Sequence, residues 1–293
     1  MAARNFYQLL EDQWASDKFV CVGLDSEYGK IPDWLKKLRH QDYVATVVDF
    51  NNRIVETTMG SASAYKPNIA FYEAYGAEGL NALRHTVQNI HLMAPSIPVI
   101  LDAKRADIGS TNSGYVEMAF NYLGVDAITV HPYLGGEALQ PFLSHADKGI
   151  IVLCRTSNPG AGEFQDIQVE MGPILVDNEP QYRPFYQVVA RHVSQKWNKN
   201  GNCALVVGAT YPNELREVRE IVGDMPILIP GIGAQGGDLE RTVEAGKDSH
   251  GQGMIINSSR GIIFASGEAD FAEVAGREAE KLNVEINHYL QTT

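Results

Sequence analysis

Residues 98–104 read PVILDAK, an apolar run that ends in an aspartate and a lysine. Apolar residues at successive positions are typical of a parallel strand that is covered on both faces. A helical pattern follows over residues 111–123, so the two segments predict one strand–helix unit. Asp102 and Lys104 lie at the carboxyl end of the predicted strand.

The same unit recurs along the chain, and eight strands can be placed with helices between them. The expected strands cover residues 19–25, 62–68, 98–104, 127–133, 149–156, 202–210, 226–233 and 253–260. The expected helices cover residues 42–59, 72–93, 111–123, 136–145, 181–197, 212–222, 238–245 and 268–289. Eightfold alternation predicts an α/β fold, a (β/α)8 TIM barrel that forms a single domain over residues 1–293. The alternative is an open doubly wound sheet. Its dinucleotide-binding version requires a GxGxxG motif with an acidic residue about 20 positions further on, and no strand here is followed by that combination.

Composition and charge narrow the class of protein. The chain has 293 residues, 44% of them hydrophobic and 20% charged, which suits a folded protein with a large core. Its net charge of −12 disfavours nucleic acid and anionic membranes as partners, because both are bound by clustered Lys and Arg. Charged residues interrupt residues 1–20, so we expect neither a signal peptide nor a membrane span, and a cytosolic (cytoplasmic) protein.

Cysteines and histidines give no sign of a metal site. Cys21, Cys154 and Cys203 each lie in an apolar run without a CxxC pair, so we expect buried free thiols. The eight histidines show no HExxH or similar ligand spacing. We therefore expect no tightly bound metal.

One connection is unusually long. Residues 157–179, SNPGAGEFQDIQVEMGPILVDNE, follow the fifth predicted strand. Connections of this length in compact domains are commonly lids or binding loops, although an insertion without a role fits equally well. We carry the segment forward as a candidate lid loop.

Charged residues end several of the predicted strands, where a barrel places its active site. Asp102 and Lys104 are two positions apart, so an extended strand would project both side chains to the same side. A lysine flanked by carboxylates, here Asp102 and Asp107, is favoured in its charged form and suits a proton donor better than a Schiff-base nucleophile. The alternative is a solvated strand end with ordinary ion pairs.

A second cluster is rich in glycine. Residues 230–238, PGIGAQGGD, follow the seventh strand, and residues 257–261, NSSRG, end the eighth. Free backbone N–H groups in such loops bind anions, and the loops after strands seven and eight are the usual phosphate site of this barrel. Arg260 would add a guanidinium group that binds the phosphate oxygens, although two tight turns with a surface arginine are also possible. By residue type alone, His131 is best interpreted as a structural histidine and Ser157 as a turn serine.

These motifs together resemble one enzyme family. The segments LDAKRADIGST, PGIGAQGGD and NSSRG, with VGLD at residues 22–25 and a lysine at the end of the second strand, resemble the orotidine 5′-monophosphate decarboxylases. The segments KPNIAFYEAYG from Lys66 and TSNPGA from Thr156 are similar to those of the longer branch of that family. The most specific motif, D-x-K-x-x-D-I-x-x-T, is complete here as Asp102, Lys104, Asp107, Ile108 and Thr111.

The resemblance implies the conversion of orotidine 5′-monophosphate (OMP) to UMP and CO2 in pyrimidine biosynthesis, without a cofactor. It implies that Lys104 protonates carbon 6 of the pyrimidine and that Asp102 lies beside the departing carboxylate. It also implies that Asp107, with Ile108 and Thr111 next to it, enters the site of a second subunit, so that the active enzyme is a homodimer with shared sites.

The resemblance assigns the remaining contacts to the rest of the substrate. Asp25 and Lys66 would hold the ribose hydroxyls and complete an alternating charge network. Ser157 would bind the pyrimidine edge, and Gln235 would link the base to the phosphate. The phosphate itself would be held by Arg260, Gly261 and the region of Gly233.

Three other functions share parts of this pattern. A magnesium-dependent sugar-phosphate lyase on the same barrel would carry a carboxylate at the second strand end, where this chain has Lys66. A Schiff-base aldolase would use Lys104 as its nucleophile. A non-catalytic sensor of a phosphate ligand would have no need of the proton donor.

Overall fold

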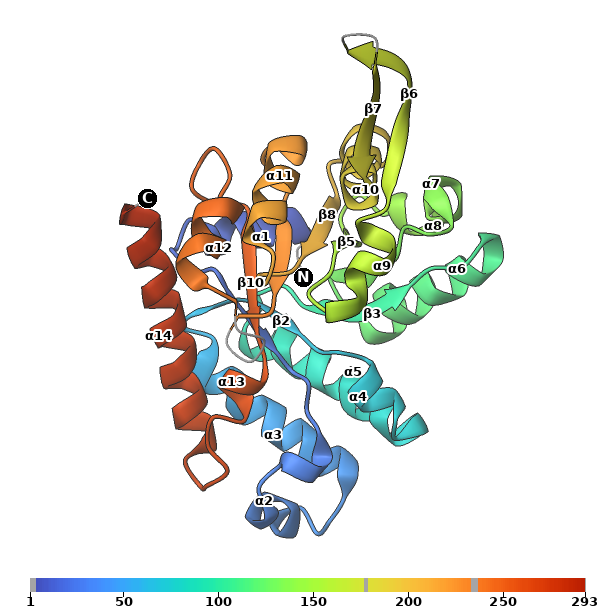
Figure 1. Ribbon diagram of the computed structural model, residues 1–293. Helices are drawn as coiled ribbons and strands as arrows, with labels where there is room; N and C mark the ends of the chain where they lie inside the picture. The colour runs from blue at the N-terminus through green and yellow to red at the C-terminus, as the bar shows by residue number, and fades with distance from the viewer. Residues whose placement is uncertain (1–3, 177–178, 233–236, 293) are drawn as a thin grey trace.

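Eight parallel strands form the centre of the molecule. A computed structural model describes residues 4–176, 179–232 and 237–292 (Figure 1). The strands lie in one sheet in the order β2-β1-β10-β9-β8-β5-β4-β3, and each pairs with its neighbours in parallel. Parallel bridges from Tyr65 to Val99 and from Asn68 to Asp102 join β2 to β3 and close the sheet. The predicted (β/α)8 barrel is confirmed.

The barrel strands follow one another around the barrel in chain order, and each lies inside its predicted range or within one residue of it. They are β1 (Val20–Gly23), β2 (Ala62–Lys66), β3 (Ile100–Arg105), β4 (Ala127–Val130), β5 (Gly149–Arg155), β8 (Cys203–Val207), β9 (Ile227–Pro230) and β10 (Met254–Ser258). Every residue of β1, β2, β4, β8 and β10 is buried, as expected for parallel strands covered by helices.

The helices surround the barrel (Figure 1). They are α1 (Phe6–Trp14), α2 (Asp33–Leu38), α3 (Tyr43–Thr58), α4 (Ala70–Glu73), α5 (Gly76–Met93), α6 (Gly109–Val116), α7 (Gly135–Ala138), α8 (Gln140–Leu143), α10 (Phe185–His192), α11 (Pro212–Val222), α12 (Leu239–Gly246), α13 (Arg260–Ile263) and α14 (Phe271–Thr292). Two of them continue as π-helices, η2 (Glu117–Leu123) after α6 and η4 (Val193–Trp197) after α10, and η1 (Tyr28–Lys30) is a 3-10 turn.

Helix ends follow local capping chemistry. The carboxylate of Asp42 accepts a hydrogen bond from the Ala45 backbone N–H at 2.7 Å and starts α3 where the sequence predicts it. Asp238 caps α12 in the same way through Arg241 N–H at 3.1 Å. The helix predicted over residues 72–93 is instead divided into α4 and α5, because Gly76, the first residue of α5, has a φ of +56°.

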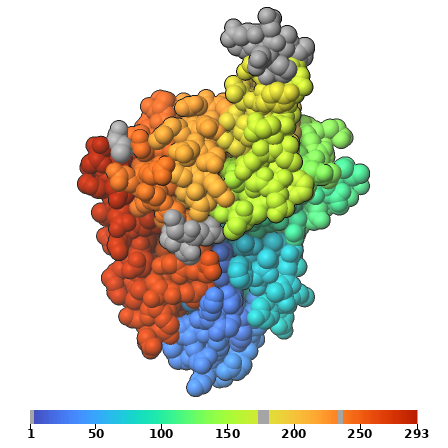
Figure 2. Space-filling view, viewed as in Figure 1, coloured from blue at the N-terminus to red at the C-terminus, as the bar shows by residue number. Residues whose placement is uncertain are grey.

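The long connection after β5 contains regular structure that was not predicted from the sequence. It forms the turn η3 (Pro159–Ala161), the short helix α9 (Gly162–Gln165) and an antiparallel hairpin of β6 (Gln168–Val176) and β7 (Glu179–Pro184). The hairpin stands out from the body of the molecule (Figure 2). The helix predicted from residue 181 is wrong at its start, since Pro184 disfavours helical geometry at the preceding residue and α10 begins only after it.

One buried arginine joins the last three strand–helix units. Arg219 of α11 is 8% exposed. Its guanidinium donates hydrogen bonds to the carbonyl oxygens of Gly246 at 2.9 Å, Gly223 at 2.5 Å, Met225 at 2.6 Å and Gly253 at 3.0 Å. Burial lowers the pKa of Arg219 to about 10, so the side chain remains charged at neutral pH.

Replacing this side chain tests its contribution to stability. Arg219→Met leaves four carbonyl oxygens without their donor, so we expect the free energy of unfolding to fall by about 3 kcal/mol. Urea denaturation measures the change. Arg216→Met is the control, because Arg216 lies on the same helix in an exposed ion pair with Glu244 at 3.4 Å and should change stability by less than about 1 kcal/mol. Equal losses in the two variants would contradict the assignment.

Candidate active site

A cavity of about 470 Å³ opens at the carboxyl end of the barrel. Each of the eight barrel strands, or the segment directly after it, contributes at least one lining residue. The charged residues among them are Asp25, Lys66, Asp102, Lys104 and Arg260. The sequence therefore predicted correctly that these charged strand ends converge.

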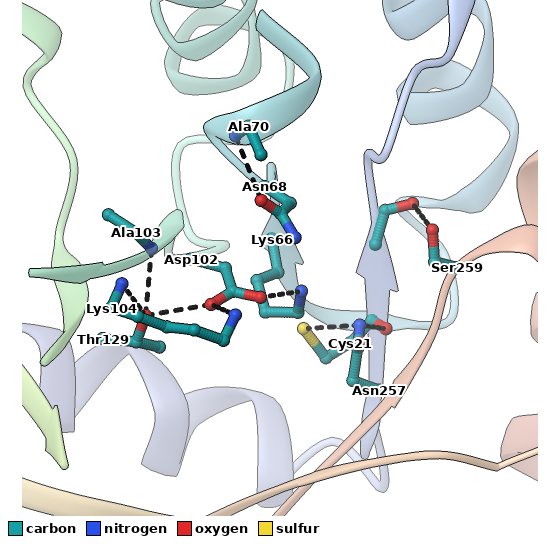
Figure 3. A network of polar contacts seen from close by, with 11 residues as sticks. Cys21, Lys66, Asn68, Ala70, Asp102, Ala103, Lys104, Thr129, Asn257 and Ser259 are labelled. Atoms are coloured by element: carbon teal, nitrogen blue, oxygen red, sulfur yellow. Dashed lines mark hydrogen bonds and ion pairs between the residues drawn. The ribbon is translucent and has the colours of Figure 1, made fainter. Parts of the chain in front are cut away.

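Three of the charged side chains form a continuous chain of ion pairs (Figure 3). Lys66 Nζ lies 3.1 Å from Asp102 Oδ2, and Lys104 Nζ lies 2.6 Å from Asp102 Oδ1. The Thr129 hydroxyl also donates to Asp102 Oδ1, at 2.9 Å. Both carboxylate oxygens are thus held, one by a buried ammonium and the other by an ammonium that is half exposed to the cavity.

The charges in this row of ion pairs determine which of its side chains are ionised. Burial alone would raise the pKa of Asp102, but the charges of Lys66 and Lys104 outweigh burial and hold the pKa well below its usual value. Burial likewise opposes the charge of Lys66, yet Asp102 and Asp25 keep its pKa above its usual value. At neutral pH the site therefore contains an ionised carboxylate between two amines, the buried one held as an ammonium.

The backbone of β3 is irregular where the chain of ion pairs begins. Lys104 has a φ of +49°, and the pairing with β4 slips between Leu101 and Arg105. The backbone N–H groups of Ala103 and Lys104 both donate to the Thr129 hydroxyl, each at 2.9 Å. The predicted strand does reach Lys104, but its backbone is not extended at that residue. Lys104 and Asp102 nevertheless meet in the cavity, as expected.

Asp25 lies in the cavity with one oxygen unused. It follows β1, and its Oδ1 atom is buried without a hydrogen-bond partner among the described residues. A buried acceptor that has no protein donor and lines a cavity is suited to a ligand that carries hydroxyl groups. Its negative charge also acts on Lys66, which places it next to the chain of ion pairs.

The far end of the cavity is formed by the segments after β9 and β10. Arg260 begins α13 and is exposed, and Ser259 donates to Gly23 O at 3.1 Å. A side chain at Gly23 would not fit, because its Cβ would lie 2.5 Å from Ser259 Cβ. Gly261 follows Arg260 but does not line the cavity. Two other predicted residues, Gly233 and Gln235, lie outside the described residues.

The second half of the family motif lies outside this cavity. Asp107, Ile108 and Thr111 do not line it, and Ile108 is 61% exposed. The backbone of Asp107 is nevertheless fixed, because its N–H donates to Asn112 Oδ1 at 2.7 Å and its carbonyl accepts from the same side chain. Within one chain the structure thus separates residues 102–104 from residues 107–111.

His131 occupies a second, mainly apolar cavity of about 530 Å³ beside the first. It shares this cavity with Tyr133 and Phe164, and its Nδ1 atom accepts a hydrogen bond from Tyr133 N–H at 3.3 Å. His131 does not line the charged cavity.

Seven of the described polar lining residues were not predicted as site residues: Asn68, Thr129, Thr156, Asn158, Gln165, Asn257 and Ser259. Asn68 lies in the segment KPNIAFYEAYG and Thr129 is the polar residue of the apolar strand AITV, so each left a signal in the sequence. Gln165 lies within the long connection, where no periodic pattern marked it. Its side chain binds Thr156 through Thr156 N–H at 2.9 Å.

All three cysteines are buried and unpaired, as predicted. Over residues 4–176, 179–232 and 237–292, no three His, Cys, Asp or Glu side chains form a group with metal-binding geometry. No helix in these described ranges is long and apolar enough to cross a membrane.

A closed barrel with charged side chains converging at its carboxyl end defines the class of (β/α)8-barrel enzymes. The family model described as Orotidine 5′-phosphate decarboxylase / HUMPS family matches residues 18–274. The chain therefore belongs to this family.

Known relatives cover almost the whole chain. The orotidine 5′-phosphate decarboxylase of Janthinobacterium sp. (strain Marseille) is 46% identical over 286 residues, which is 97% of this chain and 99% of the relative. The structure of Leishmania donovani OMP decarboxylase has a TM-score of 0.81 at 37% identity and covers 98% of this chain and 99% of that one. Leishmania donovani UMP synthase matches with a TM-score of 0.83 at 39% identity, over 98% of this chain and 57% of its own.

Thr129 offers a direct test of the site geometry. Thr129→Val removes the donor to Asp102 and the acceptor for two backbone N–H groups, so we expect the loop at Lys104 to shift. A displacement near 1 Å is enough to lower kcat/KM about 100-fold. Thr129→Ser keeps the hydroxyl and should stay within about threefold of the unmodified protein. Steady-state decarboxylation assays compare the two, and equal activity would show that the hydroxyl does not hold the site.

Proposed function

We propose that this chain is an orotidine 5′-monophosphate decarboxylase that converts OMP to UMP and CO2 in de novo pyrimidine biosynthesis, without a cofactor. The observation that carries the proposal is the pair of Lys104 and Asp102, 2.6 Å apart in the barrel cavity, with Lys66 on the other side of the carboxylate. Family membership and relatives named for this activity support it. A soluble nucleotide substrate also fits a cytosolic location.

Lys104 is proposed as the proton donor. When the bond between carbon 6 and the carboxylate breaks, its electron pair remains on carbon 6 and CO2 leaves. A fixed cation stabilises this carbanion, since no ring atom delocalises it well. At 4 Å and an effective dielectric constant near 20, one charge pair contributes about 4 kcal/mol, or roughly three decades of rate. The carbanion then takes a proton from Lys104 Nζ, which solvent restores.

Asp102 is proposed to lie beside the departing carboxylate and to hold Lys104 in position. Because the two lysines keep it ionised, it places a negative charge near that of the substrate. Loss of CO2 removes the repulsion between them, so the interaction favours the transition state over bound substrate.

The remaining residues are proposed to bind the rest of the nucleotide. Asp25, with its unused oxygen, and Lys66 would hold the ribose hydroxyls. Ser157, in the cavity wall, would bind the pyrimidine edge. The phosphate would lie at the segments after β9 and β10, held by Arg260, Gly261, Gly233 and Gln235.

We propose residues 157–179 as a lid on a single barrel domain. Ser157, Asn158 and Gln165 of this segment line the cavity. The base of the segment is tethered to the barrel by Arg155, whose guanidinium lies 3.1 Å from the Asp166 carboxylate. Closure of such a segment over bound substrate would exclude water from the reacting atoms.

We also propose that the enzyme is a homodimer with shared active sites. Asp107, Ile108 and Thr111 complete the family motif yet lie outside their own cavity. A rigid exposed loop of this kind is suited to enter the cavity of a second subunit. In a symmetric dimer each loop would complete the site of the other chain.

A magnesium-dependent sugar-phosphate lyase on the same barrel is the competing function. Such a site needs free carboxylate oxygens for the cation, which prefers oxygen ligands. Here Lys66 and Lys104 already occupy both oxygens of Asp102, and Asp25 is the only other carboxylate among the described lining residues of the cavity. The charge distribution of this cavity therefore favours decarboxylation.

The activity itself is tested with the purified protein and OMP. We expect the absorbance of OMP to fall at an undiminished rate after exhaustive treatment with a chelator, because the proposed chemistry uses side chains alone. A chelator-sensitive activity would instead support the lyase, and the absence of turnover would refute the proposed function.

Shared sites are tested by mixing inactive chains. Lys104→Ala and Asp107→Ala dimers should each have lost nearly all activity. After random exchange in an equal mixture, half of the dimers are hybrids with one intact site in two, so about one quarter of the activity should return. The control is a mixture of Lys104→Ala with Asp102→Ala chains, in which no hybrid has an intact site. Equal recovery in both mixtures, or none in either, would contradict the shared-site proposal.

A further inference from the structure

Four buried polar side chains form a closed network behind the end of β1. The Ser26 hydroxyl donates to Asn51 Oδ1 at 2.5 Å. Asn51 Nδ2 donates to the Tyr72 hydroxyl at 3.1 Å and to Thr86 Oγ1 at 3.0 Å. Each of the four residues is at most 1% exposed. They come from four separate segments, namely the loop after β1 and the helices α3, α4 and α5.

The network holds the chain on both sides of Asp25. The Tyr72 hydroxyl donates to Leu24 O at 3.1 Å, and Ser26 is itself a member of the network. On the barrel side, Leu24 N–H donates to Lys66 O at 3.0 Å. The backbone of Asp25 is therefore fixed before and after the residue, while its Oδ1 atom keeps no partner in the described chain.

Every side-chain polar atom of the central residues Asn51 and Tyr72 is hydrogen-bonded. The Asn51 amide donates both of its hydrogens and accepts one bond, and the Tyr72 hydroxyl accepts one bond and donates one. Burial raises the pKa of Tyr72 to about 12, so its hydroxyl stays protonated and remains a donor at neutral pH. A fully satisfied buried network specifies one arrangement of the segments that it joins.

Tyr72 is itself held rigidly. Helix α5 approaches it so closely that a Cβ atom at Gly79 would lie 1.7 Å from Tyr72 O. Helix α4, which contains Tyr72, follows β2 after only a few residues, and Asn68 between them lines the cavity. Tyr72 therefore connects the segment that follows Lys66 to the segment that contains Asp25.

We propose that Tyr72 and Asn51 are positioning residues that set the place of the Asp25 carboxylate relative to Lys66. The inference rests on the proposed role of Asp25 in binding the ribose. Neither side chain lines the cavity, so both act through the backbone of residues 24–26. A network that served stability alone would be satisfied equally well by apolar packing, whereas this one directs hydrogen bonds at the two neighbours of a site residue.

A double-mutant cycle tests this inference. Tyr72→Phe removes one hydroxyl and should lower kcat/KM for OMP about tenfold by displacing Asp25. In an Asp25→Asn background the same substitution should change kcat/KM by less than about twofold, because the group that it positions has already lost its charge. An effect of equal size in both backgrounds would overturn the proposal, as would unchanged kcat/KM in Tyr72→Phe alone.

Tyr65→Phe is the matched control for lost stability. The Tyr65 hydroxyl is also fully buried and donates to a backbone carbonyl, that of Val55, at 3.1 Å, but its partners on α3 are not members of the network beside Asp25. Both phenylalanine variants should lower the free energy of unfolding by similar amounts, about 1–3 kcal/mol. Only Tyr72→Phe should lower kcat/KM, and an equal loss in Tyr65→Phe would assign the effect to stability and refute positioning.

Further measurements distinguish failure of the positioning inference from a folding defect and from failure of the proposed function. If Tyr72→Phe does not fold, Ser26→Ala removes one bond on the other side of Asp25 and should show the same dependence on the Asp25 background. If Asp25→Asn leaves kcat/KM unchanged, the proposed role of Asp25 fails and the positioning inference fails with it. Decarboxylation by the unmodified chain, measured alongside, shows whether the proposed function itself still stands.

Discussion

A buried carboxylate between two lysine side chains is the interaction around which this barrel mouth is organised. Removing a carboxylate from water costs several kcal/mol, and a close cation offsets that cost only where the geometry is well fixed. Asp102 meets this condition because Lys66 and Lys104 each bind a different oxygen, at 3.1 and 2.6 Å. The partners come from β2 and β3, the two strands whose sparse bridges close the barrel, so the charged site and the closure of the sheet depend on the same junction.

The irregular end of β3 follows from this requirement. A regular strand would satisfy its backbone against β4, but the chain slips there and Thr129 supplies the missing acceptor to two N–H groups. A positive φ at a lysine costs on the order of 1 kcal/mol, which the contacts of Lys104 with Asp102 offset. Backbone strain of this kind persists only where surrounding contacts stabilise the strained conformation, and strained residues are most frequent at functional sites.

The sequence predicted the barrel well because buried parallel strands leave continuous apolar runs, and the charged ends of those runs marked the cavity. The predictions failed where a conformation depends on contacts between distant parts of the chain, or where a local sequence pattern was overlooked. Residues 166–171, DIQVEM, alternate polar and apolar residues, a pattern typical of a strand that was overlooked at the start of β6. Pro184 limits the helix after the hairpin in a way that the periodicity of residues 181–197 conceals. The positive φ of Lys104 depends on Thr129 across the sheet, which no local pattern contains. Gln165 reaches the cavity only because α9 folds back onto Thr156.

Residues 102–111 begin in the cavity and continue outside it. The chain leaves the barrel at Arg105, whose guanidinium pairs with Glu73 and lies 5.4 Å from the centre of the Tyr115 ring. Beyond this anchor, Asn112 binds the backbone of Asp107 and also donates to Ala138 O at 2.6 Å. A loop with no further role would not need such bonds, since exposed backbone is satisfied by water. The loop is instead pre-ordered, so little conformational entropy remains to be lost when its side chains meet a binding partner, which is the physical condition for donating a residue to a neighbouring site.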